Sequence, residues 1–151
     1  MIEQKLHTLG MTLPLVSTPI ANYVPFVISN NLVHISGQLP MLDGKLHYSG
    51  KLGETISTED GQAAARLCAL NILAQVKAAI GSLDRVKRCV KITGFVTATA
   101  EFTDHSQIIN GASDLIVMVF GDNGKHARAA VGVSSLPRGA SVEIEAIFEI
   151  E

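Results

Sequence analysis

Two stretches with helical periodicity, each followed by a strand-like stretch, constrain the fold of this chain most. In the first, apolar residues recur at helical spacing from a capping-box-like start near Ser57 to a C-cap at Gly81. The second runs over roughly 104–120 and is closed by Gly121. Both patterns predict long helices with one apolar face, which must be buried against another layer of structure.

The rest of the chain is rich in strand patterns. The expected strands are 23–29, 31–37, 85–99, 125–137 and 141–150, the first two joined by a turn at Asn30-Asn31 and the third carrying a possible bulge at Gly94. The order is strands, helix, strand, helix, strand, strand. This order predicts an α+β sandwich with both helices against one face of a mostly antiparallel sheet.

One strand carries an isolated cation among small side chains. In "KHARAAVGVSSLP", alternation places Ala127, Ala129, Val131 and Val133 on one face. The other face receives His126, Arg128, Ala130 and Gly132. Arg128 is then either a solvated edge charge or the anion-binding group of a pocket that the small residues leave open.

The composition favours a homo-oligomer and argues against nucleic-acid binding. Hydrophobic residues make up 47% of the chain and charged residues 17%, below the usual quarter of a soluble domain. Too few charges to coat a monomer indicate that another subunit covers part of the surface. The net charge of −2, the lack of a basic run and 5% aromatic residues leave no sign of a nucleic-acid surface.

We expect one cytoplasmic domain over 1–151, in which 1–20 form an N-terminal extension with a short helix. No signal sequence is visible, and no stretch approaches the length needed to span a membrane. Cys68 and Cys89 do not form a CxxC pair, so we interpret them as buried thiols in a reducing compartment.

Motifs for cofactor, metal or covalent chemistry are absent. "GDNGKH" lacks the full phosphate-loop spacing, and no G-x-G-x-x-G connects a strand to a helix. The five histidines show no metal-ligand spacing, and "GASDL" is not a nucleophile elbow. We therefore expect no metal and no cofactor, and a site built from an anion-binding group and a carboxylate.

Four segments in order resemble the RidA/YjgF family, which has also been described as endoribonuclease L-PSP type. They are "ISGQLP" at 35–40, "GSLDRVKRCVKITGFV" at 81–96, "ARAAVGVSSLP" at 127–137 and "VEIEAI" at 142–147. The resemblance implies a chorismate-mutase-like fold and a homotrimer whose sheets face an inner barrel. It also implies that the sites lie in clefts between subunits.

The resemblance implies a hydrolase acting on C=N bonds, which converts reactive enamines and imines of amino acids to a 2-oxo acid and ammonia. Within it, the arginine that binds the substrate carboxylate falls on Arg128 and the glutamate beside the attacking water on Glu143. The family's tyrosine and asparagine fall on Tyr23 and Asn110. A guanidinium suits bidentate carboxylate binding, and a carboxylate can orient a water or take its proton.

The chain departs from the family pattern beside the arginine. Ala130 stands where the deaminases commonly have cysteine, and His126 where they often have proline, which points to an altered substrate pocket at these two positions. Backbone N–H groups beside Ala130 are candidates to hold the water or the developing charge. Two other functions stay open: a carboxylate-binding module of the same fold without turnover, and a ribonuclease or translation inhibitor, which the acidic balance disfavours.

Overall fold

The computed structural model describes residues 1–16 and 21–151, and within them the strands form one large sheet and one small ribbon. Neighbouring strands of the large sheet are antiparallel, except that β5 and β6 are parallel. The mostly antiparallel sheet expected from the sequence is confirmed. In spatial order, the sheet contains β1 (Phe26–Ser29), β2 (Leu32–Gln38), β7 (Val142–Ile150), β5 (Val86–Thr97) and β6 (Ala127–Val133). The ribbon pairs β3 (Met41–Leu42) with β4 (Lys45–Leu46).

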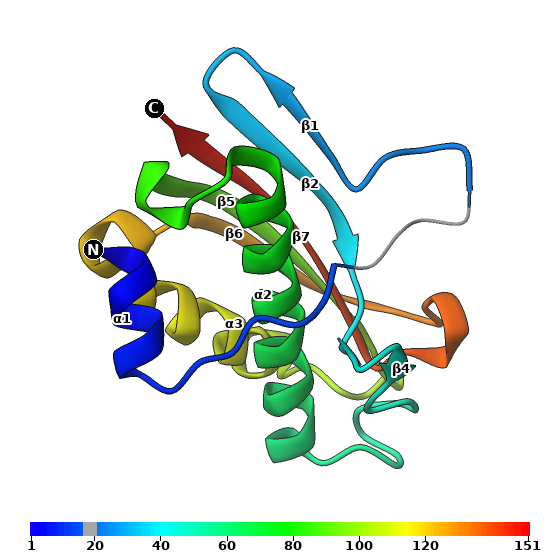
Figure 1. Ribbon diagram of the computed structural model, residues 1–151. Helices are drawn as coiled ribbons and strands as arrows, with labels where there is room; N and C mark the ends of the chain where they lie inside the picture. Colours follow the sequence, from blue (N-terminus) through cyan, green and yellow to red (C-terminus); the bar gives the residue numbers. More distant parts are fainter. Residues whose placement is uncertain (17–20) are drawn as a thin grey trace.

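The two long helices lie on one face of this sheet, as predicted (Figure 1). They are α2 (Thr58–Ile80) and α3 (His105–Phe120). The shorter α1 (Ile2–Thr8) lies beside them near the N-terminus. Single 3₁₀ turns occupy η1 (Leu83–Arg85), η2 (Gly121–Gly124) and η3 (Pro137–Gly139).

Local sequence signals explain the ends of α2. The Ser57 hydroxyl accepts a hydrogen bond from the N–H of Asp60 at 3.1 Å, the N-cap bond that the sequence predicts. Gly81 ends the helix with φ at 87°, in the left-handed region that glycine adopts readily. Contrary to the expectation from sequence, α2 is long and apolar enough to cross a membrane. However, 67% of its apolar window is buried inside the protein, as in a core helix.

The core fills the space between the sheet and the helices. Both cysteines lie in it, as expected, and burial raises the pKa of Cys89 to about 12, which leaves the thiol protonated and unreactive. Fully buried side chains come from both layers, among them Val33, Ile72, Leu73, Ile92, Ile108, Ile109, Ile116, Ile144 and Phe148.

The N-terminal helix is held against the end of α2. The Glu3 carboxylate pairs with Lys77 at 2.9 Å and accepts a hydrogen bond from the N–H of Leu83 at 2.8 Å. Leu6 adds an apolar contact to the core. The expected short helix is confirmed, while 17–20 of the expected extension lie outside the described residues.

The face of the sheet opposite the helices carries exposed small and apolar side chains. Val27 of β1 is 52% exposed and Val131 of β6 is 44% exposed. Ala127 and Ala129 are exposed beside Val131, whereas Arg128 and Ala130 are half-buried toward the helices. The alternation predicted for this strand is therefore confirmed.

Gly94 is not at a bulge, which corrects the expectation from sequence. The register shifts of β5 lie between Val86 and Arg88 and between Cys89 and Lys91. Gly94 pairs in register with Ile144 and Ala130. A Cβ atom on Gly94 would collide with the side chain of Ile109, so the glycine lets α3 approach the sheet closely.

The close approach at Gly94 predicts a steric effect on stability. We expect Gly94→Ala to lower the free energy of unfolding by about 1–3 kcal/mol, because the added methyl overpacks a site with no free volume. Denaturant unfolding at fixed protein concentration measures this. The double variant Gly94→Ala with Ile109→Val should recover part of the loss, and a double variant less stable than both single variants would contradict the steric cause.

Candidate functional site

The guanidinium of Arg128 is held in place by α3. Its Nη1 donates to Oδ1 of Asn110 at 2.8 Å and to Oγ of Ser113 at 3.1 Å, and its Nη2 donates to the carbonyl of Ser106 at 3.4 Å. These helix positions are spaced i, i+4 and i+7, so they share one face. The sequence-predicted pair of Arg128 and Asn110 is thus brought together.

All three acceptors of Arg128 are neutral. The two ion pairs found among residues 1–16 and 21–151 are Lys77–Glu3 and Lys125–Asp122, and neither involves Arg128. The guanidinium has five N–H donors, of which these hydrogen bonds use three. A half-buried cation therefore keeps two donors and its full charge for an anion.

His126 is linked to Arg128 through Ser113. The Nδ1 atom of His126 lies 2.6 Å from the carbonyl of Gly124, and its Nε2 atom lies 2.9 Å from Oγ of Ser113. No sequence motif marks Ser113 as a site residue, although its spacing of three residues from Asn110 on a helix places both on one face.

Ala130 lies on the same side of β6 as Arg128, at the edge of the sheet. The carbonyl of Val133 accepts a hydrogen bond from the N–H of Ala98, so it faces β5. The backbone N–H and C=O groups of successive residues point alternately to the two sides of a strand. The N–H groups of Ala130 and Gly132 therefore point away from β5, to the open edge. They are two further donors for an anion near Arg128.

A cavity of about 510 Å³ adjoins this edge. His105, which precedes Ser106 on α3, lines it together with Phe102 and Gly132. The rings of Phe102 and His105 meet edge to face at 5.7 Å. A Cβ atom on Gly132 would collide with the imidazole, so the glycine creates room for His105 here.

Glu143 lies on the opposite face of the sheet. It is half-buried on β7, and a Cβ atom on Gly37 would collide with its carboxylate, so this glycine makes room for the side chain. Desolvation by burial, and then the charge of Glu145, raise the pKa of Glu143. Such a carboxyl group takes up a proton more readily than a free one and suits acid–base work.

Tyr23 lies at the far edge of the sheet from Arg128. Its ring is 57% exposed, just before β1. The neighbouring Val24 accepts a hydrogen bond from the hydroxyl of Ser36 at 2.7 Å, and Ser36 precedes the Gly37 that faces Glu143. This hydrogen bond ties the segment that follows Tyr23 to β2, next to the glycine that faces Glu143.

The predicted site residues thus do not all lie together in one chain. Arg128 pairs with Ile92 of β5, and Ile92 pairs with Ala146 of β7; Glu143 precedes Ala146 by three residues. Strand geometry puts the Cα atoms of Arg128 and Glu143 about 14 Å apart, with side chains on opposite faces. Arg128, Asn110, Ala130 and His126 lie together on the helix side; Glu143 lies on the other face, and Tyr23 is exposed before β1.

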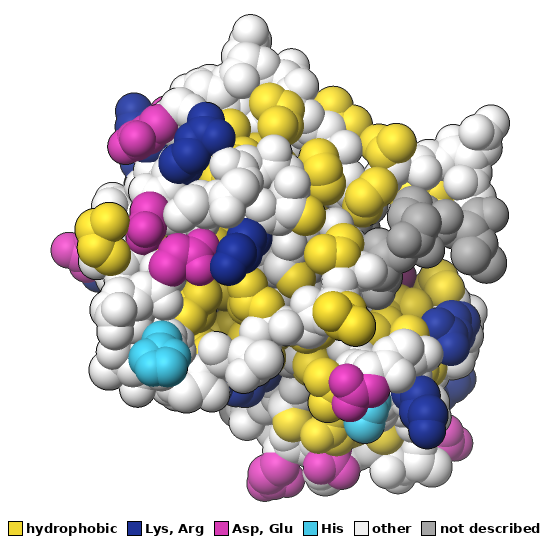
Figure 2. Space-filling view, viewed as in Figure 1, with side chains coloured by type: hydrophobic (Ala, Val, Ile, Leu, Met, Phe, Trp, Pro, Cys, Tyr) yellow, Lys and Arg dark blue, Asp and Glu magenta, His cyan; other side chains and the backbone are white. Residues whose placement is uncertain are grey.

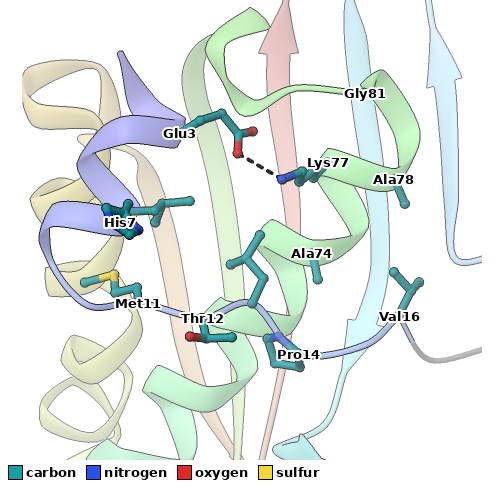
Figure 3. Close-up of a pocket in the computed structure, with 12 residues that line it drawn as sticks. Glu3, His7, Met11, Thr12, Pro14, Val16, Ala74, Lys77, Ala78 and Gly81 are labelled. Atoms are coloured by element: carbon teal, nitrogen blue, oxygen red, sulfur yellow. Dashed lines mark hydrogen bonds and ion pairs between the residues drawn. The ribbon is translucent and has the colours of Figure 1, made fainter.

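Two other cavities fit a substrate anion less well. One of about 590 Å³ lies between α2 and the N-terminal segment, with an apolar floor (Figure 2) and the mutually neutralised Glu3–Lys77 pair at its edge (Figure 3). The other, about 250 Å³, lies on the outer sheet face and contains Glu145 beside Lys91. Within the described ranges, no group of three His, Cys, Asp or Glu residues could hold a metal ion.

Comparison with known proteins places this geometry in context. Residues 3–147 match the family described as "YjgF/chorismate_mutase-like, putative endoribonuclease". Protein TCP17 of Trypanosoma cruzi is 49% identical over 150 residues, covering 99% of this chain and 94% of its own. The crystal structure of Atu1372 from Agrobacterium tumefaciens, of unknown function, is 54% identical with a TM-score of 0.92, covering 99% and 93%. Escherichia coli TdcF with bound serine is 26% identical with a TM-score of 0.67, covering 90% and 94%.

The raised pKa of Glu143 predicts a pH-dependent stability difference. Above its folded-state pKa the buried charge costs stability, and below the unfolded-state pKa the cost disappears because the group is protonated in both states. We expect Glu143→Gln to raise the melting temperature at about pH 7 and to leave it unchanged at about pH 3. The exposed Glu101→Gln is the matched control; an equal gain at both pH values would contradict the electrostatic cause.

Proposed function

Because the chain belongs to the RidA/YjgF family, we propose that it hydrolyses small 2-imino acids and their enamine tautomers to a 2-oxo acid and ammonia. The observation that carries the proposal is the half-buried guanidinium of Arg128, which has only neutral partners among the described residues and keeps two donors beyond them. A 2-imino acid offers the matching carboxylate directly beside its C=N carbon. Binding that carboxylate bidentately fixes the carbon for attack.

The chemistry needs one water and one proton carrier. Glu143 takes a proton from the water as the water oxygen bonds to the imine carbon. The C=N π electrons move to nitrogen, which takes that proton from Glu143. The hydroxyl of the resulting carbinolamine then gives its proton to Glu143 as C=O forms, and the nitrogen receives this proton as the C–N bond breaks and ammonia leaves. A carboxyl group with a raised pKa accepts a proton more readily than a free one, and it can return that proton. The edge N–H groups of Ala130 and Gly132 are placed to stabilise developing negative charge.

In this proposal a complete site needs two copies of the chain. Arg128 is in β6, at one edge of the sheet, and Tyr23 precedes β1, the strand at the other edge. The two edge strands are about four strand spacings, or 19 Å, apart. When the β6 edge of one copy lies beside the β1–β2 side of the next, Arg128 meets the neighbour's Glu143. Such head-to-tail contacts close into a ring, here a homotrimer with the exposed small and apolar sheet face inside.

The ligand class has support from a relative. Escherichia coli TdcF was solved with bound serine, an amino acid that carries the same 2-carboxylate as the proposed substrates. Ala130 is compatible with binding without turnover, since it replaces the cysteine typical of the deaminases. Pyruvate binding at Arg128 with no ammonia release from any imine would support that second function.

Removal of Arg128 should abolish the anion site. We expect Arg128→Ala to lower kcat/KM for freshly generated 2-iminopropanoate by about 10- to 100-fold, because charge-assisted hydrogen bonds to the carboxylate are lost. Ammonia release measures this, with size-exclusion chromatography to check assembly. Arg138→Ala, in the exposed η3 turn, is the matched control. Full activity of Arg128→Ala would refute the mechanism.

A mixing experiment tests the two-copy site. Arg128→Ala and Glu143→Gln should each be strongly impaired alone, yet a co-assembled 1:1 mixture should regain activity where an intact Arg128 faces an intact Glu143. In a randomly mixed trimer about three quarters of the rings contain both variants with one intact site in three, so about a quarter of the wild-type activity returns. No recovery in verified mixed oligomers would refute the two-copy site.

A further inference from the structure

We propose that Ser113 and His126 are positioning residues that orient Arg128 through a relay of directed hydrogen bonds. The relay runs from Arg128 through Ser113 and His126 to the carbonyl of Gly124, over distances of 3.1, 2.9 and 2.6 Å. The inference rests on the proposed function, because that function gives Arg128 a carboxylate to bind. It adds two residues that the family resemblance does not assign.

The chemistry of its two ends fixes the direction of the two outer bonds in the relay. A carbonyl only accepts, so His126 donates from Nδ1 to Gly124. A guanidinium only donates, so Oγ of Ser113 accepts from Arg128. When the imidazole is neutral, Nε2 is an acceptor, and the Ser113 hydroxyl donates to it. The relay as proposed uses the neutral Nδ1–H tautomer of His126, in which each hydrogen bond reinforces the next.

The relay removes an alternative that a helical serine otherwise has. A serine in the middle of a helix can turn its hydroxyl to the carbonyl four residues earlier. Here the Ser113 hydroxyl donates its proton to Nε2 of His126 and not to its own helix, so a lone pair of Oγ faces Nη1 of Arg128. Together with Oδ1 of Asn110, Ser113 fixes the plane of the guanidinium and so the direction of its remaining donors.

Loss of the relay should therefore weaken carboxylate binding more than the chemical step. We expect Ser113→Ala and His126→Ala each to raise the Kd for pyruvate and the KM for 2-iminopropanoate by about 3- to 10-fold, with kcat changed less than twofold, since one hydrogen bond is lost. His126→Gln keeps an acceptor near the place of Nε2 and should restore most of the affinity. His34→Ala, on β2, is the matched histidine control.

Three readouts decide the proposal. Nitrogen-15 spectra of His126 should show a protonated Nδ1 and an unprotonated Nε2, and the opposite tautomer would overturn the relay. Pyruvate affinities of Ser113→Ala and His126→Ala equal to wild type would overturn it as well, as would a fall in kcat at constant KM. If wild-type protein binds pyruvate but releases no ammonia from imines, the proposed function fails while the affinities still test the relay.

Discussion

The close packing of α3 on the β5–β6 edge of the sheet is the constraint on which the site depends. Gly94 has no side chain, and Ile109 of α3 occupies the space a Cβ atom would fill. The helix therefore lies near enough to β6 for Ser106, Asn110 and Ser113 to reach the guanidinium of Arg128. A bulkier residue at 94 would move the acceptors as well as the core, so stability and anion binding are coupled through one glycine.

The two faces of the sheet carry different parts of the proposed site. The helix side buries the core and aligns Arg128, whereas the other face presents Glu143 in a space made by Gly37. A single chain cannot bring a substrate to both, because the two side chains point away from each other across the sheet. Assembly is thus part of the proposed site, and the low charge of the chain and its exposed valines are what such an assembly needs.

The sequence predicted the elements well because their signals are local. Periodicity, the Ser57 cap and the glycines after each helix depend on neighbours a few residues away, and the alternation around Arg128 depends only on strand geometry. Gly94 was misread, because its reason is a contact with Ile109 that no local pattern reveals. Ser113 likewise acts through residues distant in sequence, which no local pattern reveals. That Arg128 and Glu143 point to opposite faces depends on how β6, β5 and β7 pair, which the sequence pattern does not show either.

The chain's departures from the family pattern make physical sense as one set. In the deaminases a proline often precedes the Ala-Arg pair, and a proline has no side-chain group to accept a hydrogen bond from a serine on α3. His126 supplies that acceptor, and Ser113 passes the interaction to Arg128. Ala130 carries no polar group that competes for the guanidinium, and the direct hydrogen-bond partners that the described residues offer Arg128 lie on α3. In the proposed site, Arg128 is thus kept for the carboxylate while the residues around it differ from the family pattern, which fits a pocket altered around a common fold.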